Sequence, residues 1–317
     1  MRHGSIGAAA PGPEARYAFA LSGIRRSFPG FTLGPLDLSL PAGCILGLVG
    51  ENGAGKTTAI RLLLGMLRPD AGEAQVLGER VDAARDNCAF RARVGVVPDE
   101  IGLPPDMSAR QLAGLFRRVF PAWDGGAYRG YLDRLAVPAD KPFSALSSGT
   151  RKKLALAAAL SHGAELLVFD EATAGLDPLV RDDILTILMD FTRDGAHAAL
   201  LSSHIVSDLE KACDYIALLH AGRLLLCDEK DRLLERFGLL RGSAAALAAV
   251  PEAAVRARRA TPYGVELLVE RALLPAALRA DPVNIEDLFI LLAREEGCAC
   301  AASVSYTHLR AHETSQD

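Results

Sequence analysis

The chain has 317 residues, 50% of them hydrophobic, and a formal net charge of -4 at pH 7. This length allows one large hydrophobic core or two smaller ones, and charges of mixed sign without a basic face argue against nucleic acid as a partner. No stretch approaches the ~18–20 uninterrupted apolar residues of a transmembrane helix, and the six cysteines are scattered without a CxxC pair. We therefore expect a protein of the reducing cytoplasm whose contact with any membrane is peripheral.

The N-terminal segment, residues 1–16, is rich in Gly, Ala and Pro and lacks the apolar core of a signal peptide. It predicts a disordered tail, with folded sequence beginning at Tyr17. From there to about Gly78, short apolar runs alternate with tight turns, a pattern that is typical of β-strands.

A strand, a glycine-rich loop and a helix follow one another within this region. Cys44–Val49 predicts a buried strand, and apolar residues at helical spacing predict a helix from Thr57 to Leu67, before Pro69. The loop between them, Gly50-Glu-Asn-Gly-Ala-Gly-Lys-Thr57, fits the pattern GxxxxGK[ST] in full. In such a phosphate loop the backbone N–H groups surround phosphate oxygens at the N-terminus of the following helix.

This motif predicts a site for ATP and Mg²⁺. Lys56 would reach the β- and γ-phosphates, and the Thr57 hydroxyl would ligate Mg²⁺. A glycine-rich turn that matches by chance is the alternative, but it would not explain the strand before the loop and the helix after it. The residues expected to bind nucleotide here are Gly50, Asn52, Gly53, Ala54, Gly55, Lys56, Thr57 and Thr58.

From about residue 99 to residue 163 the pattern changes to repeated amphipathic segments. Ala109–Val119 and Ala127–Leu135 are examples, and they predict an inserted helical subdomain. It separates the glycine-rich loop from the strands that follow.

The apolar strand predicted at Leu166–Phe169 runs directly into two acids, Asp170 and Glu171. A helix at Val180–Asp194 and a strand at Ala198–Ser202 follow, and this alternation implies a parallel sheet with right-handed crossovers. Ligands bind at the C-terminal ends of such strands. We therefore expect Asp170 to hold Mg²⁺ and Glu171 to activate the attacking water as general base. A strand that merely ends in acids is common, so this interpretation depends on the phosphate loop.

Beyond Leu240 the sequence becomes rich in Ala and Arg. A strand is predicted at Val265–Val269 and an amphipathic helix at Ile285–Ala293, and we expect residues 243–303 to form a separate C-terminal extension. Residues 304–317 show no periodicity and resemble translated sequencing-adapter sequence, so they are predicted to be a non-native tail.

Further motifs resemble those of ABC ATPases. Ala172-Thr-Ala-Gly-Leu-Asp-Pro178 is similar to the D-loop of that family, Leu146-Ser-Ser-Gly-Thr150 to its signature, and His204 to its switch histidine. Phe28 lies where the family places an aromatic ring that stacks on adenine, with Phe31 as a rival. Several motifs in the family's order and spacing are far more specific than a phosphate loop alone.

In the family that the chain resembles, each nucleotide lies between the phosphate loop of one copy and the signature of another. The resemblance therefore implies that Ser147, Gly149 and Asp177 contact nucleotide across a dimer. It also implies that His204 acts in catalysis with Glu171 and Lys56. The resemblance covers about Ala18 to Gly242.

Three positions depart from the family pattern. Ser148 and Thr150 replace Gly and Gln of the signature, and Asp99 stands where the family has the Q-loop glutamine. That glutamine touches the Mg²⁺ site, so Asp99 is expected to be a further metal-binding residue. An acid at this position resembles a branch linked to ABC-2-type exporters, which includes the bacitracin-resistance and acetoin-utilisation types.

The fold that the resemblance implies is α/β. It consists of a phosphate-loop NTPase (RecA-like) core, an antiparallel β subdomain, the inserted α-helical subdomain and a small C-terminal α+β extension. The ATPase domain would cover residues 17–242.

The resemblance also implies an ATPase that uses ATP and Mg²⁺ and dimerises on ATP, with itself or with a related ATPase subunit. The dimer would drive a separately encoded membrane permease, as an exporter, from the inner face of the cell membrane. The alternative is a soluble ABC ATPase that acts on ribosomes or DNA. Such proteins usually carry two cassettes, a long coiled-coil insertion or zinc modules, and none is visible in this sequence.

Overall fold

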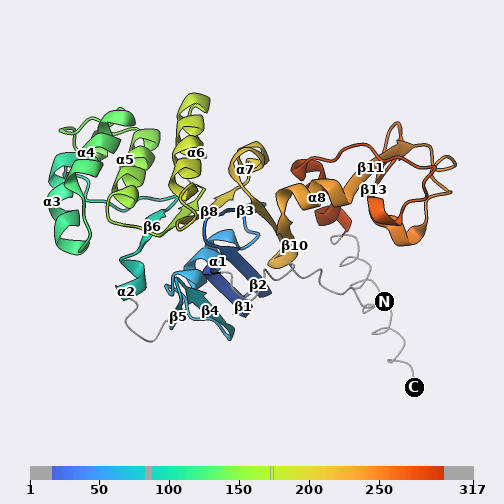
Figure 1. Ribbon diagram of the computed structural model, residues 1–317, viewed down its shortest axis with the longest axis horizontal. Coiled ribbons are helices and arrows are strands. Elements are labelled where there is room, and N and C mark those ends of the chain that lie inside the picture. Colours follow the sequence, from blue (N-terminus) through green and yellow to red (C-terminus); the bar gives the residue numbers. More distant parts are fainter. Residues whose placement is uncertain (1–15, 83–87, 172, 174, 296–317) are drawn as a thin grey trace, which may run out of the picture. The chain divides into compact units, whose positions relative to one another are not determined.

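The computed structural model describes residues 16–82, 88–171, 173 and 175–295, which fall into two compact units (Figure 1). The first unit ends at Asp228 and the second begins at Glu229. The tail predicted at residues 304–317 and all but the last residue of the tail predicted at residues 1–16 lie outside the described residues. Within the described part of the chain, no helix is both long enough and apolar enough to cross a membrane.

A six-stranded sheet forms the centre of the first unit (Figure 1). In spatial order its strands are β10 (Arg223–Glu229), β9 (Tyr215–His220), β3 (Ile45–Gly50), β8 (Ala198–Ser203), β7 (Leu166–Asp170) and β6 (Val94–Val97). The last five run parallel, which confirms the parallel sheet predicted from alternating strands and helices. Every residue of β3, β7 and β8 is buried, as expected for central strands covered on both faces.

A second, antiparallel sheet belongs to the same core. Its strands, in spatial order, are β2 (Phe31–Pro41), β1 (Tyr17–Phe28), β4 (Ala71–Val76) and β5 (Glu79–Val81). Helix α1 (Lys56–Leu63) contacts strands of both sheets, and one cluster of buried apolar side chains joins all three. The predicted antiparallel β subdomain is therefore confirmed.

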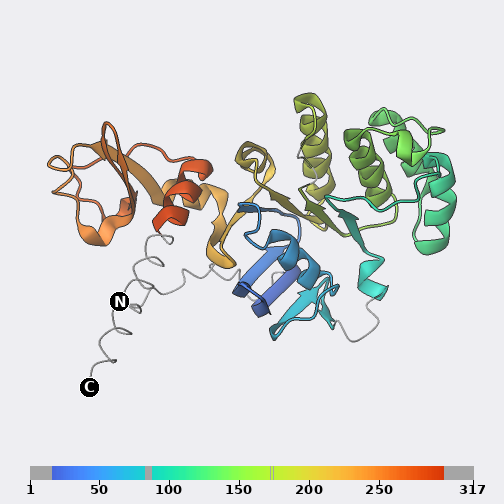
Figure 2. The same cartoon turned by 180° about the vertical axis from the view of Figure 1, so that it is seen from behind.

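Helix α1 ends before Leu67, the end predicted from the sequence. Gly65 has a φ angle of 63°, in the left-handed region, which stops the helix at the preceding turn. Helices α6 (Pro178–Thr192) and α7 (Val206–Ala212) lie on the face of the parallel sheet opposite to α1 (Figures 1 and 2).

The predicted helical subdomain lies between β6 and β7. It contains α3 (Ala109–Val119), α4 (Gly125–Arg134), a short 3₁₀ helix (Phe143–Ala145) and α5 (Ser148–Leu160), while the short helix α2 (Cys88–Arg91) precedes β6. Ser108 and Gln111 form a capping box at the start of α3, and Asp124 caps α4 through the N–H groups of its first turn. These caps explain why the helices begin where they do.

The second unit is a small α+β structure. Helix α8 (Lys230–Arg236) leads into a sheet with the order β11 (Phe237–Gly242), β13 (Gly264–Glu270) and β12 (Val255–Thr261), and a helix covers residues 285–295. The sequence placed the start of this extension at residue 243. The structure places it at Glu229, because β11 pairs with β13 along its whole length and so belongs to the extension.

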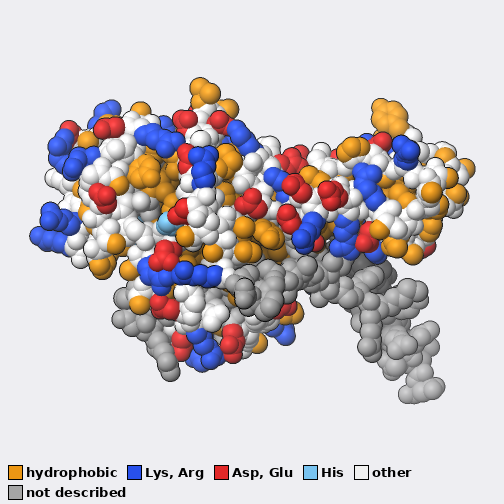
Figure 3. All heavy atoms as spheres, in the orientation of Figure 1, with side chains coloured by type: hydrophobic (Ala, Val, Ile, Leu, Met, Phe, Trp, Pro, Cys, Tyr) orange, Lys and Arg blue, Asp and Glu red, His pale blue; other side chains and the backbone are white. Residues whose placement is uncertain are grey.

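Charged side chains of both signs are interspersed on the face of the molecule that Figure 3 shows. Local ion pairs between charged side chains include Arg93 with Glu165 at 2.6 Å and Arg110 with Asp140 at 2.8 Å. On this face the surface agrees with the mixed charge pattern of the sequence.

Candidate active site

The loop between β3 and α1 has the backbone shape of an anion-binding loop. Gly53 and Gly55 adopt φ angles of 83° and 107°, in the left-handed region that glycine reaches without strain. A Cβ atom on Gly50 would lie 2.6 Å from the carbonyl oxygen of Leu219, so a side chain there would clash with the backbone. Helix α1 has Gly55 as its N-cap and no side-chain cap, which leaves its first N–H groups available to phosphate oxygens.

The expected nucleotide ligands line this loop at different depths. The N–H of Gly222 donates to the carbonyl oxygen of Ala54 at 3.0 Å, which ties the buried part of the loop to the turn after β9. The other side of the loop faces solvent, where a phosphate chain can approach it. The exposed ligands are Asn52, Gly53 and Thr57, and the half-buried ones are Gly55 and Thr58.

Lys56 is the buried cation of the loop, with 5% of its surface exposed. Its Nζ donates hydrogen bonds to the carbonyl oxygens of Gly50 at 2.6 Å and Glu51 at 3.1 Å, and it forms an ion pair with Glu171 Oε1 at 2.9 Å. A buried ammonium group is costly to leave unpaired. Phosphate oxygens entering the loop would therefore replace some of these partners.

Glu171 directly follows β7 and is held on two sides. Its φ angle of 52° lies in the left-handed region, which is unusual for a residue other than glycine. Its N–H donates to both the carbonyl oxygen and Oγ of Ser202, each at 3.2 Å. Oε2 accepts a hydrogen bond from His204 Nδ1 at 2.7 Å, while Oε1 faces Lys56. The structure thus brings together the three residues expected to be catalytic.

Asp170, the last residue of β7, lies at the C-terminal edge of the parallel sheet. It is buried, and Oδ1 accepts a hydrogen bond from Ser202 Oγ at 2.8 Å. Among the described residues, no cation pairs with this carboxylate. Thr57 offers an exposed hydroxyl in the first turn of α1. Carboxylate and hydroxyl oxygens are hard donors of the kind that Mg²⁺ takes, so the residues present fit the expected metal ion.

Asp99, the other expected metal ligand, lies beyond the end of β6. Its Oδ1 is 3.5 Å from Nζ of Lys152 in α5, and 60% of its side chain is exposed. Lys152 also donates to the carbonyl oxygen of Glu171 at 2.9 Å. The structure therefore connects Asp99 to the general-base candidate through a lysine that sequence reasoning did not select. Arg151 and Lys153, the neighbours of Lys152, are also basic, so the sequence does not distinguish the three residues. Only the fold shows that Lys152 is the buried one.

Phe28, the candidate for stacking on adenine, is the last residue of β1. It is 38% exposed and stacks on Phe31 with ring centroids 6.4 Å apart, while the Arg26 guanidinium lies 5.4 Å from its centroid. Phe31 packs directly against the loop, because a Cβ atom on Gly55 would lie 3.0 Å from its ring. Of the two rivals, Phe28 is the one with the more exposed face for stacking on a base.

The signature and the D-loop lie against each other. Ser147 caps α5, accepting from the Thr150 N–H at 3.2 Å, and its Oγ is 2.8 Å from Thr150 Oγ1. A Cβ atom on Gly149 would lie 3.2 Å from the Leu176 side chain. Asp177 caps α6, accepting from the N–H of Leu179 at 3.0 Å. Ser147, Gly149 and Asp177 thus lie at the neighbouring N-termini of α5 and α6.

A partly buried ion pair joins α6, the helix that follows the D-loop, to α7, the helix that follows His204. Arg181 Nη2 donates to the carbonyl oxygen of Leu176 at 3.3 Å, and its Nε lies 3.6 Å from Asp208 Oδ2 in α7. Burial raises the pKa of the Asp208 carboxyl. Sequence reasoning did not select this pair, because isolated charges on two helices give no sign that they face each other.

Comparison with known proteins points to one family. A family profile described as ABC transporter matches residues 33–174. Nod factor export ATP-binding protein I of Ralstonia nicotianae is 35% identical over 230 residues, which cover 71% of this chain and 71% of the relative. The protein of the same name from Cupriavidus pinatubonensis is 32% identical over 290 residues, which cover 82% and 86% of the two chains.

Solved structures show a likeness in fold. The ATP-binding subunit of an ABC transporter superposes with a TM-score of 0.62 and 23% sequence identity, and the match covers 69% of this chain and 92% of that one. The fold that the sequence predicted, a phosphate-loop NTPase core with added subdomains, is confirmed by this likeness and by the two sheets of the first unit.

Proposed function

The chain belongs to the ABC transporter family of ATP-binding proteins, which hydrolyse ATP, and from that premise we propose that it powers an exporter by driving a separately encoded membrane permease. The observation that carries its chemistry is the cluster of Lys56, Glu171 and His204, in which Glu171 contacts both other residues within 2.9 Å. The names of the relatives support export, since those proteins are ATP-binding proteins of Nod factor export.

In the proposed reaction, ATP and water give ADP and phosphate. The N–H groups of the loop and Lys56 hold the β- and γ-phosphates, and Glu171 accepts the proton of the attacking water. His204 orients the Glu171 carboxylate through the bond to Oε2. Thr57 and Asp170 would hold Mg²⁺, whose positive charge offsets that of the phosphate oxygens.

We assign Ser147, Gly149 and Asp177 to the nucleotide of a second ATPase subunit, either another copy or a related chain. Ser147 and Asp177 are exposed and Gly149 is half-buried, and Leu179, two residues after Asp177, is 79% exposed. A single exposed leucine is common on protein surfaces, so the assignment rests on the resemblance of the two segments to the signature and the D-loop of the family. ATP binding would then close two such subunits around shared sites.

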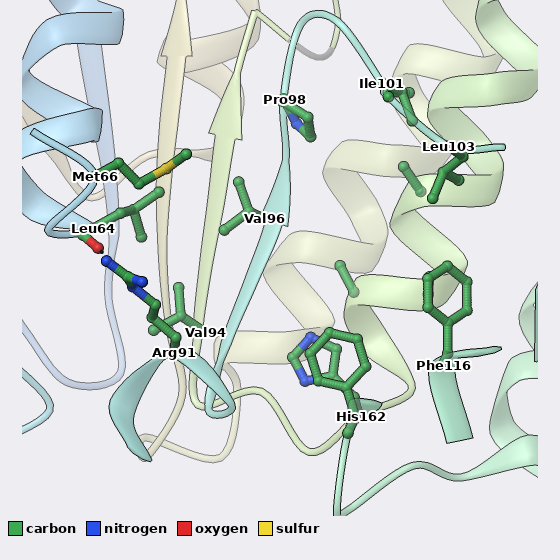
Figure 4. Close-up of a pocket in the computed structure, with 15 residues that line it drawn as sticks. Leu64, Met66, Arg91, Val94, Val96, Pro98, Ile101, Leu103, Phe116 and His162 are labelled. Carbon is green, nitrogen blue, oxygen red and sulfur yellow. Dashed lines mark hydrogen bonds between the residues drawn. The ribbon is translucent and has the colours of Figure 1, made fainter. Parts of the chain in front are cut away.

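The permease is assigned to an apolar cleft between the ATPase core and the helical subdomain (Figure 4). The cleft has a volume of about 450 Å³, and its walls include Val96, Ile101 and Phe116. His162 also lines it, and burial lowers the pKa of this imidazole, which favours the neutral form near pH 7. Arg91 is the one charged residue among the described residues of the lining, and its guanidinium donates to the carbonyl oxygens of Leu64 and Gly65. A largely apolar cleft of this kind fits an apolar segment of a partner protein.

A substitution at Met66 tests whether the cleft binds the permease. Met66 lines the cleft wall and is 68% exposed, so a substitution there leaves the core intact. Met66→Glu is expected to lower stimulation of ATP hydrolysis by the permease at least about tenfold, since a charge would be desolvated on binding. Basal hydrolysis should stay unchanged. The measurement is phosphate release with and without the permease that copurifies from membranes.

The matched control is Tyr263→Glu, which places the same charge at a 98% exposed apolar position of the second unit. Equal stimulation of Met66→Glu and Tyr263→Glu by the permease would show that the permease does not bind in the cleft. Copurification with ribosomes or DNA instead of a membrane protein would favour the soluble alternative. The proposal also places the protein in the cytoplasm, at the inner face of the cell membrane.

Asp99 lies between Pro98 and Ile101, which both line the cleft. Asp99→Ala is expected to weaken stimulation by the permease several-fold, while the affinity for ATP stays within about tenfold, or ~1.4 kcal/mol. The carboxylate is one methylene shorter than the family's glutamine, so its contact with Mg²⁺ is expected to run through water. Titration with a fluorescent ATP analogue and coupled phosphate release measure the two effects. Equal stimulation in wild type and Asp99→Ala would leave Asp99 a turn residue.

A further inference from the structure

Lys152 is a buried cation that contacts the backbone of Glu171, one of the three residues of the catalytic cluster. It lies in α5, the helix that begins at the signature, and only 7% of its side chain is exposed. Its Nζ donates to the carbonyl oxygen of Glu171 at 2.9 Å and lies 3.5 Å from Asp99 Oδ1. One side chain thus links the signature helix, Asp99 and the backbone of Glu171.

The backbone of Glu171 needs such support, because a left-handed φ of 52° is unfavourable for a residue with a Cβ atom. Its N–H is fixed by Ser202 at 3.2 Å, and its carbonyl oxygen is fixed by Lys152. The two peptide groups that flank a Cα atom set the direction of its side chain. Hydrogen bonds on both of them therefore determine where the Glu171 carboxylate points.

We propose that Lys152 is a positioning residue, which holds Glu171 at the angle where its carboxylate reaches the attacking water. Its second contact makes that angle depend on Asp99, whose neighbours Pro98 and Ile101 line the cleft. The inference rests on the proposed role of Glu171 as general base. It does not need the permease, because the contact to the Glu171 carbonyl lies within one subunit.

A lysine kept only for packing would behave differently. Packing needs the methylene stem but not the ammonium group, so Lys152→Met would then be neutral, as the two side chains have similar length and volume. A positioning role needs the donor. A misplacement of about 1 Å in a reacting group costs on the order of 10²-fold in rate, which is the scale of effect expected here.

The experiment compares the purified full-length chain with Lys152→Met, Lys152→Arg and the control Lys153→Met, which removes the same charge from the next, half-buried position of α5. Lys152→Met should lower kcat about 10–100-fold and change KM for ATP less than about threefold. Lys152→Arg should recover most of the rate, and Lys153→Met should match wild type. Melting temperatures show whether each variant is folded, and Lys152→Leu, which also lacks a donor, replaces Lys152→Met if the latter melts below the assay temperature.

A double mutant separates positioning from a general structural role. In a Glu171→Gln background, Lys152→Met should cost less than about twofold, because there is no longer a base to position. A full further loss in that background, a normal kcat in Lys152→Met, or a raised KM with unchanged kcat would each overturn the inference. If Glu171→Gln alone kept the wild-type rate, the proposed base would be wrong instead, so the two failures are distinguishable.

Discussion

Replacing Glu171 by Gln is expected to lower ATP turnover by about 10²–10⁴-fold while ATP binding is retained. The amide has the shape of the carboxylate, and its oxygen can still face the Lys56 ammonium group, which lies 2.9 Å from Oε1 in the wild type. It cannot take a proton from water, so the loss falls on kcat. Phosphate release at saturating ATP measures the turnover, and titration with a fluorescent ATP analogue measures the binding.

The matched control for this substitution is Glu73→Gln on β4. Glu73 is an exposed acid that pairs with Arg80 at 2.9 Å on the surface, where such pairs contribute little. It should turn over ATP at the wild-type rate. A Glu171→Gln protein as active as Glu73→Gln would show that another group activates the water.

Mixing two inactive variants is expected to restore hydrolysis if the site is shared between subunits. Lys56→Ala removes the cation from the phosphate loop, and Ser147→Arg places a large side chain in the signature segment at the start of α5. Each variant alone should show almost no turnover, and Ser147→Arg monomers should still bind ATP. In a mixed dimer both lesions fall on one site, and the other site is intact. An equal mixture of the two variants should therefore contain about a quarter of the intact sites of the wild-type protein.

The measurement is phosphate release as a function of mixing ratio, with a maximum expected near equal amounts. Size-exclusion chromatography with ATP shows whether mixed dimers form, and a mixture of Lys56→Ala with Glu171→Gln is the control. Both substitutions affect the half of the site that contains the phosphate loop. Each site of that mixed dimer therefore carries one of the two lesions. Mixed dimers that form but do not hydrolyse ATP would contradict a site shared between phosphate loop and signature.

Much of the fold could be read from local patterns, since these depend on neighbours in sequence. The apolar run before Asp170 and the glycine spacing before Lys56 place two strands and a loop, and β7 and β3 lie where these patterns predicted them. The caps of α3 and α6, Ser108 and Asp177, are also local signals. The family motifs added the signature and the D-loop as candidates for a site across a dimer, which stays a prediction.

Contacts between distant segments were decided by the tertiary structure alone. The extension starts at Glu229 because β11 pairs with β13, and no pattern within β11 tells which sheet it will join. Lys152 looks in sequence like the basic residues on either side of it, and only the packing of α5 buries it under Glu171. Hydrophobic periodicity specifies which face of an element is buried, but it does not specify its partner. The sequence therefore predicted the residues of the candidate chemistry and the elements that carry them, and packing decides which side chains surround those residues.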